Sequence, residues 1–153
     1  MGRHAKPAVP LWSLWKRDPE LAKVCSLLVD PSPASESAAI ERGLPAGTWR
    51  ELQKIGFSRD EIALVIGNST KTIRRKENRG EPLDIAEGDR TMRLLHVTTE
   101  AVEAFGETDK ALTWMRRANV ALLGKTPLAM IASEAGTALV RRALGVIAYG
   151  GVA

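Results

Sequence analysis

Cysteine, histidine and aromatic residues are scarce in this sequence. Its 153 residues include one cysteine, two histidines and only 5% aromatic residues, whereas 44% are hydrophobic. A single thiol excludes an internal disulfide, and together with two histidines it excludes a cysteine-rich zinc site. Because only 5% of the residues are aromatic, the core must be built mainly from aliphatic side chains. Cys25 lies in an apolar run, residues 21–28, and is interpreted as a buried structural thiol.

Long apolar runs are missing as well. No run approaches the roughly 20 residues that a membrane-spanning helix requires. The basic segment 1–7 is not followed by a continuous apolar stretch, because Trp12, Trp15 and Lys16 interrupt it, so we expect no secretory signal. We predict a cytoplasmic protein without a membrane partner. The net charge of +4 permits a polyanionic partner without requiring one.

Residues typical of a catalytic centre are also few. The two histidines, His4 and His96, lie far apart in the sequence. The glycine pair at residues 43–47 lacks the following lysine and hydroxyl residue of a phosphate-binding loop. Ser58 and Ser69 are better explained as helix caps than as nucleophiles. We therefore expect no catalytic residue, no cofactor and no metal.

Strict two-residue alternation is nowhere sustained, so no strand is expected and the fold class is all-α. Residues 1–17 are predicted to form an arm, in which Trp12 and Trp15 either dock on the protein body, touch a partner or reach DNA. A helix is expected from about Asp18 to the break at residues 30–33. Further helices are expected at residues 34–42, 48–55, 58–66, after residue 69, at 83–105, from 108 through 115, at 128–132 and after a break at Gly136, with Thr48 and Thr108 acting as caps.

One stretch near the middle of the chain has the residue pattern of a helix-turn-helix. Ser58 and Glu61 have the spacing of a capping box at the start of a helix. Ile62 and Ile66 lie four residues apart and share one face of that helix. Gly67 can adopt the left-handed conformation that ends it.

The second helix of this motif is cationic. Asn68 or Ser69 can cap it, and Ile73 can hold it against the first helix. Residues 58–80 carry six cations against three anions. Lys76 stands where many such motifs have an apolar residue, so we expect the helix to be short or to turn outward there. Arginine can read guanine, while lysine, serine and threonine mostly contact phosphates. The alternative is that this is an ordinary solvated basic helix without a partner. The predicted DNA-binding residues are Ser69, Thr70, Lys71, Thr72, Arg74 and Arg75.

The longest helical run, residues 83–105, has an apolar stripe with spacings of three and four. The stripe either packs in the core, which we favour, or pairs with a sister helix in a dimer. His96 in this run is interpreted as a partly buried polar residue. The stripe consists of Leu95, Thr98, Val102 and Phe105.

Two sets of residues resemble a known family. The later set, from Trp114-Met115 through Ala118-Asn119, Leu122, Gly124, Pro127-Leu128, Gly136, Val140, Leu144 and Ile147 to Tyr149-Gly150, resembles the toxin-binding domain of Xre/MbcA/ParS antitoxins. The earlier set resembles the DNA-binding half of the same antitoxins and comprises residues 69–75, Leu83, Glu87, Arg93-Leu94, Phe105-Gly106 and Ala111. Ala118 replaces a proline that the family often has, which would let the preceding helix run on.

This resemblance implies a domain organisation and a function. Residues 1–48 would form an N-terminal arm and helical extension, 49–106 an Xre-like helix-turn-helix domain, and 107–153 the toxin-binding domain. Such antitoxins pair with RES-domain toxins, which consume NAD or transfer its ADP-ribose, and cover the toxin's NAD cleft. They also bind the operator of their own operon, typically as dimers. We therefore expect a homodimer or a toxin–antitoxin hetero-oligomer.

The C-terminal segment has a composition that suits this role. Residues 109–153 carry six cations against two anions, and a dinucleotide cleft can attract cations. The last residues are small and apolar, so they can enter a pocket; the alternative is that the helix only packs the core while residues 149–153 fray. A transcriptional regulator without a toxin partner is the competing function. The predicted toxin-binding residues are Arg116, Val140, Arg141, Leu144, Ile147, Tyr149, Gly150, Gly151, Val152 and Ala153.

Overall fold

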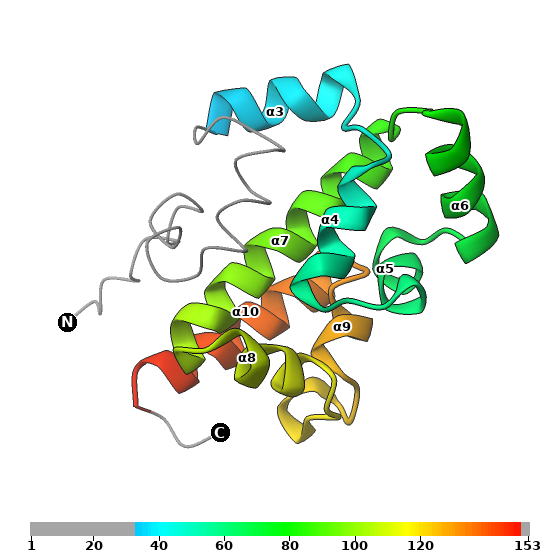
Figure 1. The fold of residues 1–153 in the computed structure, drawn as a ribbon. Helices are drawn as coiled ribbons and strands as arrows, with labels where there is room; N and C mark the ends of the chain where they lie inside the picture. Colours follow the sequence, from blue (N-terminus) through cyan, green and yellow to red (C-terminus); the bar gives the residue numbers. More distant parts are fainter. Residues whose placement is uncertain (1–32, 151–153) are drawn as a thin grey trace.

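The computed structural model describes residues 33–150, and over these residues the fold is all-α, as predicted (Figure 1). An isolated bridge between Asn119 and Lys125 is the β feature of this part of the chain. The predicted helix from Asp18, Cys25, Trp12 and Trp15 lie outside the described residues. In chain order the helices are α3 (Pro33–Arg42), α4 (Thr48–Ile55), α5 (Arg59–Ile66), α6 (Thr70–Arg79), α7 (Ile85–Phe105), α8 (Thr108–Met115), the 3-10 helix η1 (Val120–Leu122), α9 (Pro127–Met130) and α10 (Glu134–Ala148).

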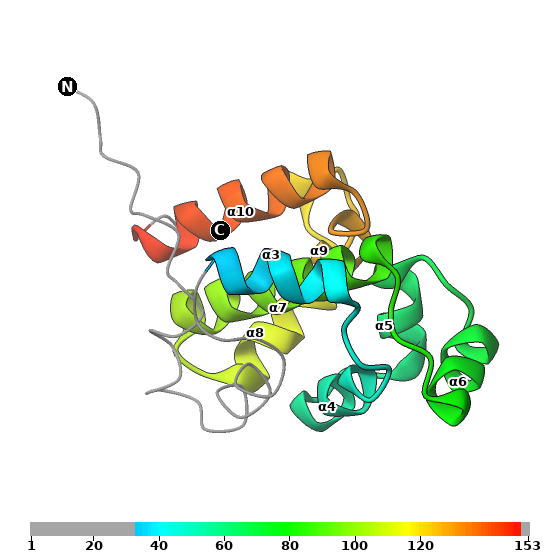
Figure 2. The same ribbon diagram turned by 90° about the horizontal axis from the view of Figure 1, so that it is seen from above.

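Helix α7 is the axis on which the other helices are arranged. It runs through the middle of the molecule, with α5 beside its N-terminal half and with α8 and α10 along the rest (Figures 1 and 2). Its buried threonines donate their hydroxyl protons to the carbonyl four residues earlier, as Thr98 does to Leu94 at 2.6 Å. This bond removes the cost of burying a hydroxyl group. Leu95, Thr98 and Val102 are buried and Phe105 is half-buried against the same core, which confirms that the stripe packs in the core.

A continuous apolar core joins the two halves of the chain. Trp49, Ile62, Leu94, Met115 and Val140 come from five different helices and belong to one cluster of buried residues. Burial of aliphatic area of this kind is the main stabilising contribution in a helical fold. The helices before α7 and those after it therefore share one core.

The caps predicted from the sequence fall into two groups. The Ser58–Glu61 capping box and the left-handed Gly67 are confirmed. The caps predicted at Thr48 and Thr108 are wrong, because α4 and α8 begin at these residues and the preceding Gly47 and Glu107 occupy the cap positions. Neither of these two cap residues makes a side-chain cap bond. Thr48 is buried, and the tertiary fold decides its position more than its capping preference does.

Gly136 does not break the chain, contrary to the prediction. It lies in the first turn of α10, and its N–H donates to the hydroxyl of the cap residue Ser133 at 3.0 Å. A Cβ atom at this position would lie 1.9 Å from the carbonyl oxygen of Met130. Glycine is therefore required because α9 and α10 approach closely at this point, not because the helix ends.

Candidate DNA-binding helix and partner-binding surface

Helices α5 and α6 form a helix-turn-helix. Gly67 has φ 75°, which turns the chain after α5, and Ser69 caps α6 by accepting a hydrogen bond from the Thr72 N–H at 3.1 Å. Ile62 is fully buried beneath the turn. Ile73 is the one residue of the fully described α6 that is buried. The remaining length of α6 projects from the body at one end of the molecule (Figure 2).

The side chains predicted to contact DNA lie mostly on the exposed face of α6. Lys71, Arg74 and Arg75 are exposed, and they form no hydrogen bond or ion pair within residues 33–150. Thr70 and Thr72 are half-buried, and Thr72 also accepts a hydrogen bond from the Ser69 hydroxyl at 2.9 Å. The structure thus groups three uncompensated cations on one helix. Such a group suits a phosphate backbone.

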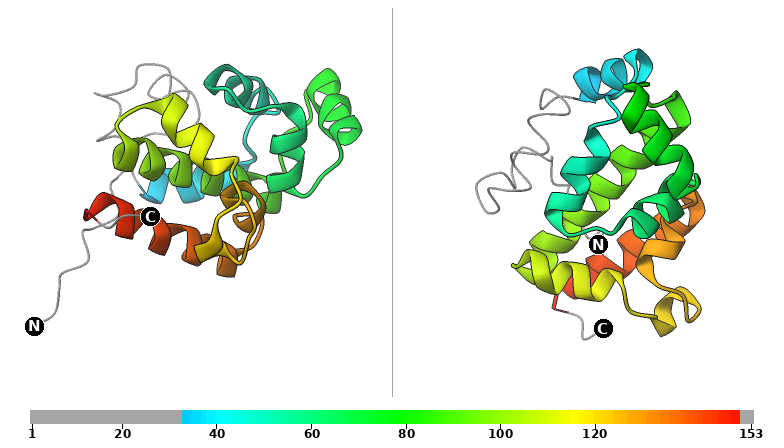
Figure 3. Two further views of the ribbon diagram at one scale, coloured as in Figure 1. Left: turned by 90° about the horizontal axis from the view of Figure 1, so that it is seen from below. Right: turned by 45° about the vertical axis from the view of Figure 1, so that its right-hand side comes forward.

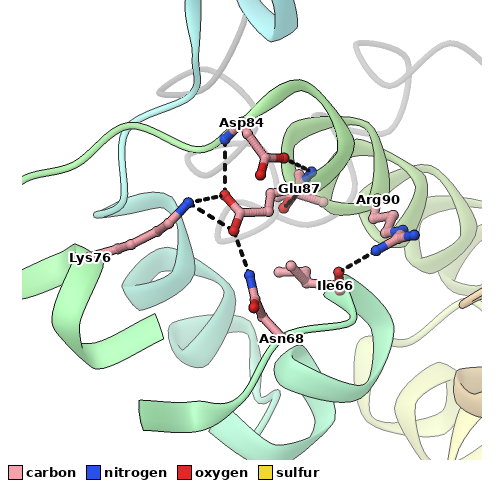
Figure 4. A network of polar contacts seen from close by, with 7 residues as sticks. Ile66, Asn68, Lys76, Asp84, Glu87 and Arg90 are labelled. Carbon is pink, nitrogen blue, oxygen red and sulfur yellow. Dashed lines mark hydrogen bonds and ion pairs between the residues drawn. The ribbon is translucent and has the colours of Figure 1, made fainter. Parts of the chain in front are cut away.

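Lys76 does not shorten α6, contrary to the expectation from its position. Its ammonium group donates to both carboxylate oxygens of Glu87, at 2.9 and 2.7 Å, and α6 continues to Arg79 (Figure 4). Glu87 is buried, and it also accepts hydrogen bonds from the Asn68 amide and from the Asp84 N–H. The two bonds from Lys76 fix α6 to the start of α7, the bond from Asn68 fixes the turn before α6, and the bond from Asp84 belongs to the capping box of α7 itself. Lys76 therefore replaces an apolar contact by a charge-assisted one.

Sequence reasoning missed the role of Glu87, although a signal was present. Asp84 and Glu87 have the spacing of a capping box, and the structure contains this box at the start of α7. The spacing indicates the helix start but not the partners Lys76 and Asn68. A second contact holds the turn itself, since Arg90 donates to the Ile66 carbonyl at 2.8 Å (Figure 4). A Cβ atom on Gly67 would lie 2.6 Å from Nη1 of Arg90, so a side chain there would displace this guanidinium, which gives a second reason for glycine.

The residues predicted to contact a toxin separate into buried and exposed groups. Val140 is 0% and Leu144 3% exposed, so in this chain they pack the core instead of forming a contact surface. Ile147 is half-buried, whereas Tyr149 and Gly150 are exposed at the end of α10. Gly151, Val152 and Ala153 lie outside the described residues. The burial of Val140 and Leu144 agrees with the alternative left open by the sequence, in which this helix packs the core.

The two predicted arginines already have partners within the chain. Arg116 donates to both carboxylate oxygens of Glu61, at 2.8 and 3.0 Å, and to the Gly56 carbonyl. Arg141 donates to Glu100 at 3.0 Å. Arg116 thus ties the end of α8 to the helix-turn-helix. Arg141 ties α10 to α7.

These pairs change the ionisation of their members. Partial burial alone would raise the pKa of Glu61, but hydrogen bonds from Arg116 and Ser58 outweigh it, and the pKa is lowered. The hydrogen bond to Glu61 raises the pKa of Arg116. At Glu100 desolvation by burial dominates over the nearby Arg141, so the pKa of this carboxyl is raised. The two pairs therefore differ: one stabilises a charged carboxylate, and the other carries a cost for burying it.

The segment between α8 and α9 carries an apolar surface that sequence reasoning did not single out. Helix α8 ends at Met115, so the expectation that it runs on through Ala118 is wrong. Asn119 instead caps η1 by accepting a hydrogen bond from the Ala121 N–H. Val120 and Leu123 point into solvent on either side of the buried Leu122.

The described residues also bear on metal binding and membrane insertion. Within residues 33–150, no group of three or more histidine, cysteine, aspartate or glutamate side chains is arranged to hold a metal ion. None of the helices in this part of the chain has the length and apolar character needed to cross a membrane.

The fold and the exposed cationic helix define a helix-turn-helix protein with a second helical unit built on the same long helix. Comparison with known proteins assigns both units. Residues 35–96 match the antitoxin Xre-like helix-turn-helix domain, and residues 100–150 match the antitoxin Xre/MbcA/ParS C-terminal toxin-binding domain. The chain belongs to the Xre/MbcA/ParS antitoxin family.

Curated relatives carry the same family name. The chain is similar to Antitoxin Xre of Pseudomonas putida, with 35% identity over 80 residues that cover 52% of this chain and 50% of that protein. It is also similar to Antitoxin Xre of Photorhabdus laumondii, with 29% identity over 74% of this chain and 78% of that protein. Antitoxin Xre of Yersinia enterocolitica is 28% identical over 78% of this chain and 95% of that protein. The match to the Pseudomonas protein thus spans about half of its length.

Proposed function

We propose that this chain neutralises a RES-domain toxin and represses its own operon. In this proposal the C-terminal region covers the toxin's NAD cleft, and α6 reads operator DNA from a homodimer or a toxin–antitoxin hetero-oligomer. The domains would be divided as predicted, at residues 48 and 106. The proposal assigns no catalytic step and no cofactor to this chain.

The observation that supports the proposal most directly is the separation of two surfaces. The cationic face of α6 lies near one end of α7, and the exposed end of α10 lies near the other end in every view (Figures 1 and 3). Both surfaces can therefore be engaged at once without competing for space. A chain that must hold a toxin and an operator together needs this arrangement.

The chemistry of each surface supports its assigned partner. Lys71, Arg74 and Arg75 are uncompensated on α6, which suits the phosphates and guanine edges of a duplex. The end of α10 presents Tyr149, 64% exposed, and Gly150, which offers little side-chain bulk. An apolar segment with few bulky groups suits a narrow cleft.

Operator binding is tested by replacing one α6 cation at a time. Arg74→Ala and Arg75→Ala should each weaken binding to operator DNA, by about tenfold or more where the arginine reads a guanine. Loss of a phosphate contact, expected for Lys71→Ala, should lower the salt slope by about one unit. Arg142→Ala removes an exposed cation from α10 and is the matched control. If all three α6 variants bind like the wild type, α6 is not the DNA-binding helix.

Neutralisation is tested by deletion of residues 149–153. The shortened chain should fail to protect cells from the toxin and still bind the operator, because the C-terminal end of α10 lies away from α6 (Figure 3). Retained protection would exclude the C-terminal residues as the element that covers the cleft. Analytical ultracentrifugation tests the oligomer, and a monomer at all concentrations would contradict symmetric reading of two half-sites.

The alternative is a regulator that has no toxin partner. It accounts for α5 and α6 but gives the second unit no task. Co-expression with the protein encoded by the neighbouring reading frame distinguishes the two. Stable co-purification of the two proteins supports an antitoxin. If this chain purifies alone whether or not the neighbouring protein is co-expressed, the result supports the regulator.

A further inference from the structure

The segment between α8 and α9 presents two large apolar side chains to solvent. Val120 is 95% and Leu123 79% exposed, the highest values among the large apolar residues of the described part of the chain. They flank Leu122, which is fully buried and fixes the segment to the core. Single exposed apolar residues are common, but a closely spaced pair on an anchored loop marks an interaction site.

This loop is held in a conformation that its sequence does not favour. Leu123 has φ 60° and is the one non-glycine residue with a positive φ among residues 33–150. A bulky side chain is strained there, whereas glycine is not. Backbone hydrogen bonds fix the strained turn. The Leu123 N–H donates to the Val120 carbonyl, and the Gly124 N–H donates to the Asn119 carbonyl. Strained residues that the surrounding structure holds in place cluster at binding sites.

The charged residues of the loop's own sequence have one sign. Between Asp109 and Glu134 the sequence contains no acidic residue, while Arg117 and Lys125 flank the apolar pair. Both cations are exposed, and neither forms an ion pair within the described residues. The surface is thus an apolar tip with a basic edge. A complementary partner has an apolar pocket with carboxylates at its rim.

We propose that Val120 and Leu123 are an anchor that inserts into an apolar, acid-rimmed pocket of the toxin. The inference rests on the proposed function and adds a second contact to the C-terminal residues. The loop lies inside the segment that matches a toxin-binding domain. A symmetric dimer through this loop is disfavoured, because a two-fold axis would bring the flanking cations close to their own copies.

Operator DNA is not the expected occupant of this loop. Valine and leucine side chains have no donor or acceptor for base edges or phosphates. The exposed cations of the helix-turn-helix, Lys71, Arg74 and Arg75, lie on α6, outside the toxin-binding match, whereas the loop lies inside it. Substitutions in the loop should therefore change toxin affinity and leave operator affinity unchanged.

Leu123→Gly is the most informative substitution. It removes the proposed anchor and also relieves the left-handed strain, so the melting temperature should be unchanged or higher. Affinity for the toxin should fall by about tenfold or more, as expected for a central contact residue. Val120→Ser removes the other half of the pair and should weaken binding as well. Ile85→Ser is the matched control, because Ile85 is 62% exposed at the N-terminal end of α7.

The probe is the protein encoded beside this chain, purified as a catalytically inactive variant and titrated by calorimetry against the full chain. Wild-type binding with loss in Leu123→Gly and Val120→Ser, and none in Ile85→Ser, supports the anchor. Full binding by both loop variants overturns the anchor and leaves the proposed function intact. No binding by the wild type overturns both. The loop variants should lose toxin affinity selectively. If they instead lower the melting temperature, the operator affinity or the self-association of the chain, the anchor is also overturned.

Discussion

The two ends of α7 are held by different interactions. At its N-terminal end, the buried Glu87 accepts hydrogen bonds from Lys76, Asn68 and the Asp84 N–H. At its other end, α8 and α10 pack against it, and Leu112, Val140 and Leu144 of these helices share one apolar core with Val102 of α7. The charged pair at that end, Arg141 and Glu100, lies toward the surface.

This difference reflects what each end must position. Helix α6 buries Ile73 and little else, so apolar packing alone would leave its orientation poorly defined. Hydrogen bonds are directional and fix that orientation, which DNA readout requires. Helix α10 buries an apolar stripe and needs no such bonds. Polar side chains therefore fix the orientation of α6 at one end of α7, and apolar packing of α8 and α10 provides stability at the other end.

The largest expected effect comes from Glu87→Gln. It leaves the Lys76 ammonium, whose side chain is mostly buried, without a counter-charge, so the free energy of unfolding should fall by about 3 kcal/mol. Operator affinity should fall as well, since α6 loses its attachment to α7. Urea unfolding and fluorescence anisotropy with operator DNA measure the two effects.

Glu100→Gln is the matched control at the other end. Burial raises the pKa of Glu100, so the ionised carboxylate carries a cost that glutamine removes together with the Arg141 pair. The free energy of unfolding should therefore change by less than about 1 kcal/mol. Equal effects of the two substitutions would show that the two ends do not differ in the way described above.

An intermediate effect is expected for Gly136→Ala, which tests the packed end. The new Cβ atom would lie 1.9 Å from the Met130 carbonyl oxygen, so α10 must move away from α9. The free energy of unfolding should fall by about 1–3 kcal/mol. Gly145→Ala in the same helix places its Cβ where no atom lies within 4 Å and should raise stability by up to about 1 kcal/mol. Thermal unfolding of both variants checks the signs, and a shared sign would contradict this account.

The smallest expected effect concerns the pair that joins the two units, Glu61 and Arg116. The pKa of Glu61 is lowered in the fold from 4.5, so its contribution is present above that pH and is lost as the pH falls through the lowered pKa. Glu61→Gln keeps the capping box but removes the charge and should cost at most about 1 kcal/mol near neutral pH. The difference from the wild type should vanish in acid. A difference that stays constant with pH in urea titrations would exclude the charge as its source.

Local patterns in the sequence predicted much of this fold. The Ser58–Glu61 spacing, Gly67 and Ile73 specify the helix-turn-helix because capping, left-handed turns and helical period depend on neighbouring residues. The outward position of Lys71, Arg74 and Arg75 follows from the same period. Three of the expectations that failed did so for one reason. Whether Gly136 breaks a helix, whether Lys76 ends one and whether Thr48 caps one depend on residues distant in sequence.

The sequence by itself determined an all-α chain with a cationic helix-turn-helix and the features of an antitoxin family, since these depend on residue type and short spacing. Tertiary structure alone decided that Glu87 compensates Lys76 and that Val120 and Leu123 stand in solvent, and it chose between the two readings left open for Val140 and Leu144. Contacts of this kind join residues that come together only when the other helices pack against α7. Helical spacing identifies residues that share a face, as it did for Leu95, Thr98 and Val102, whereas no local pattern contains the contacts between distant segments.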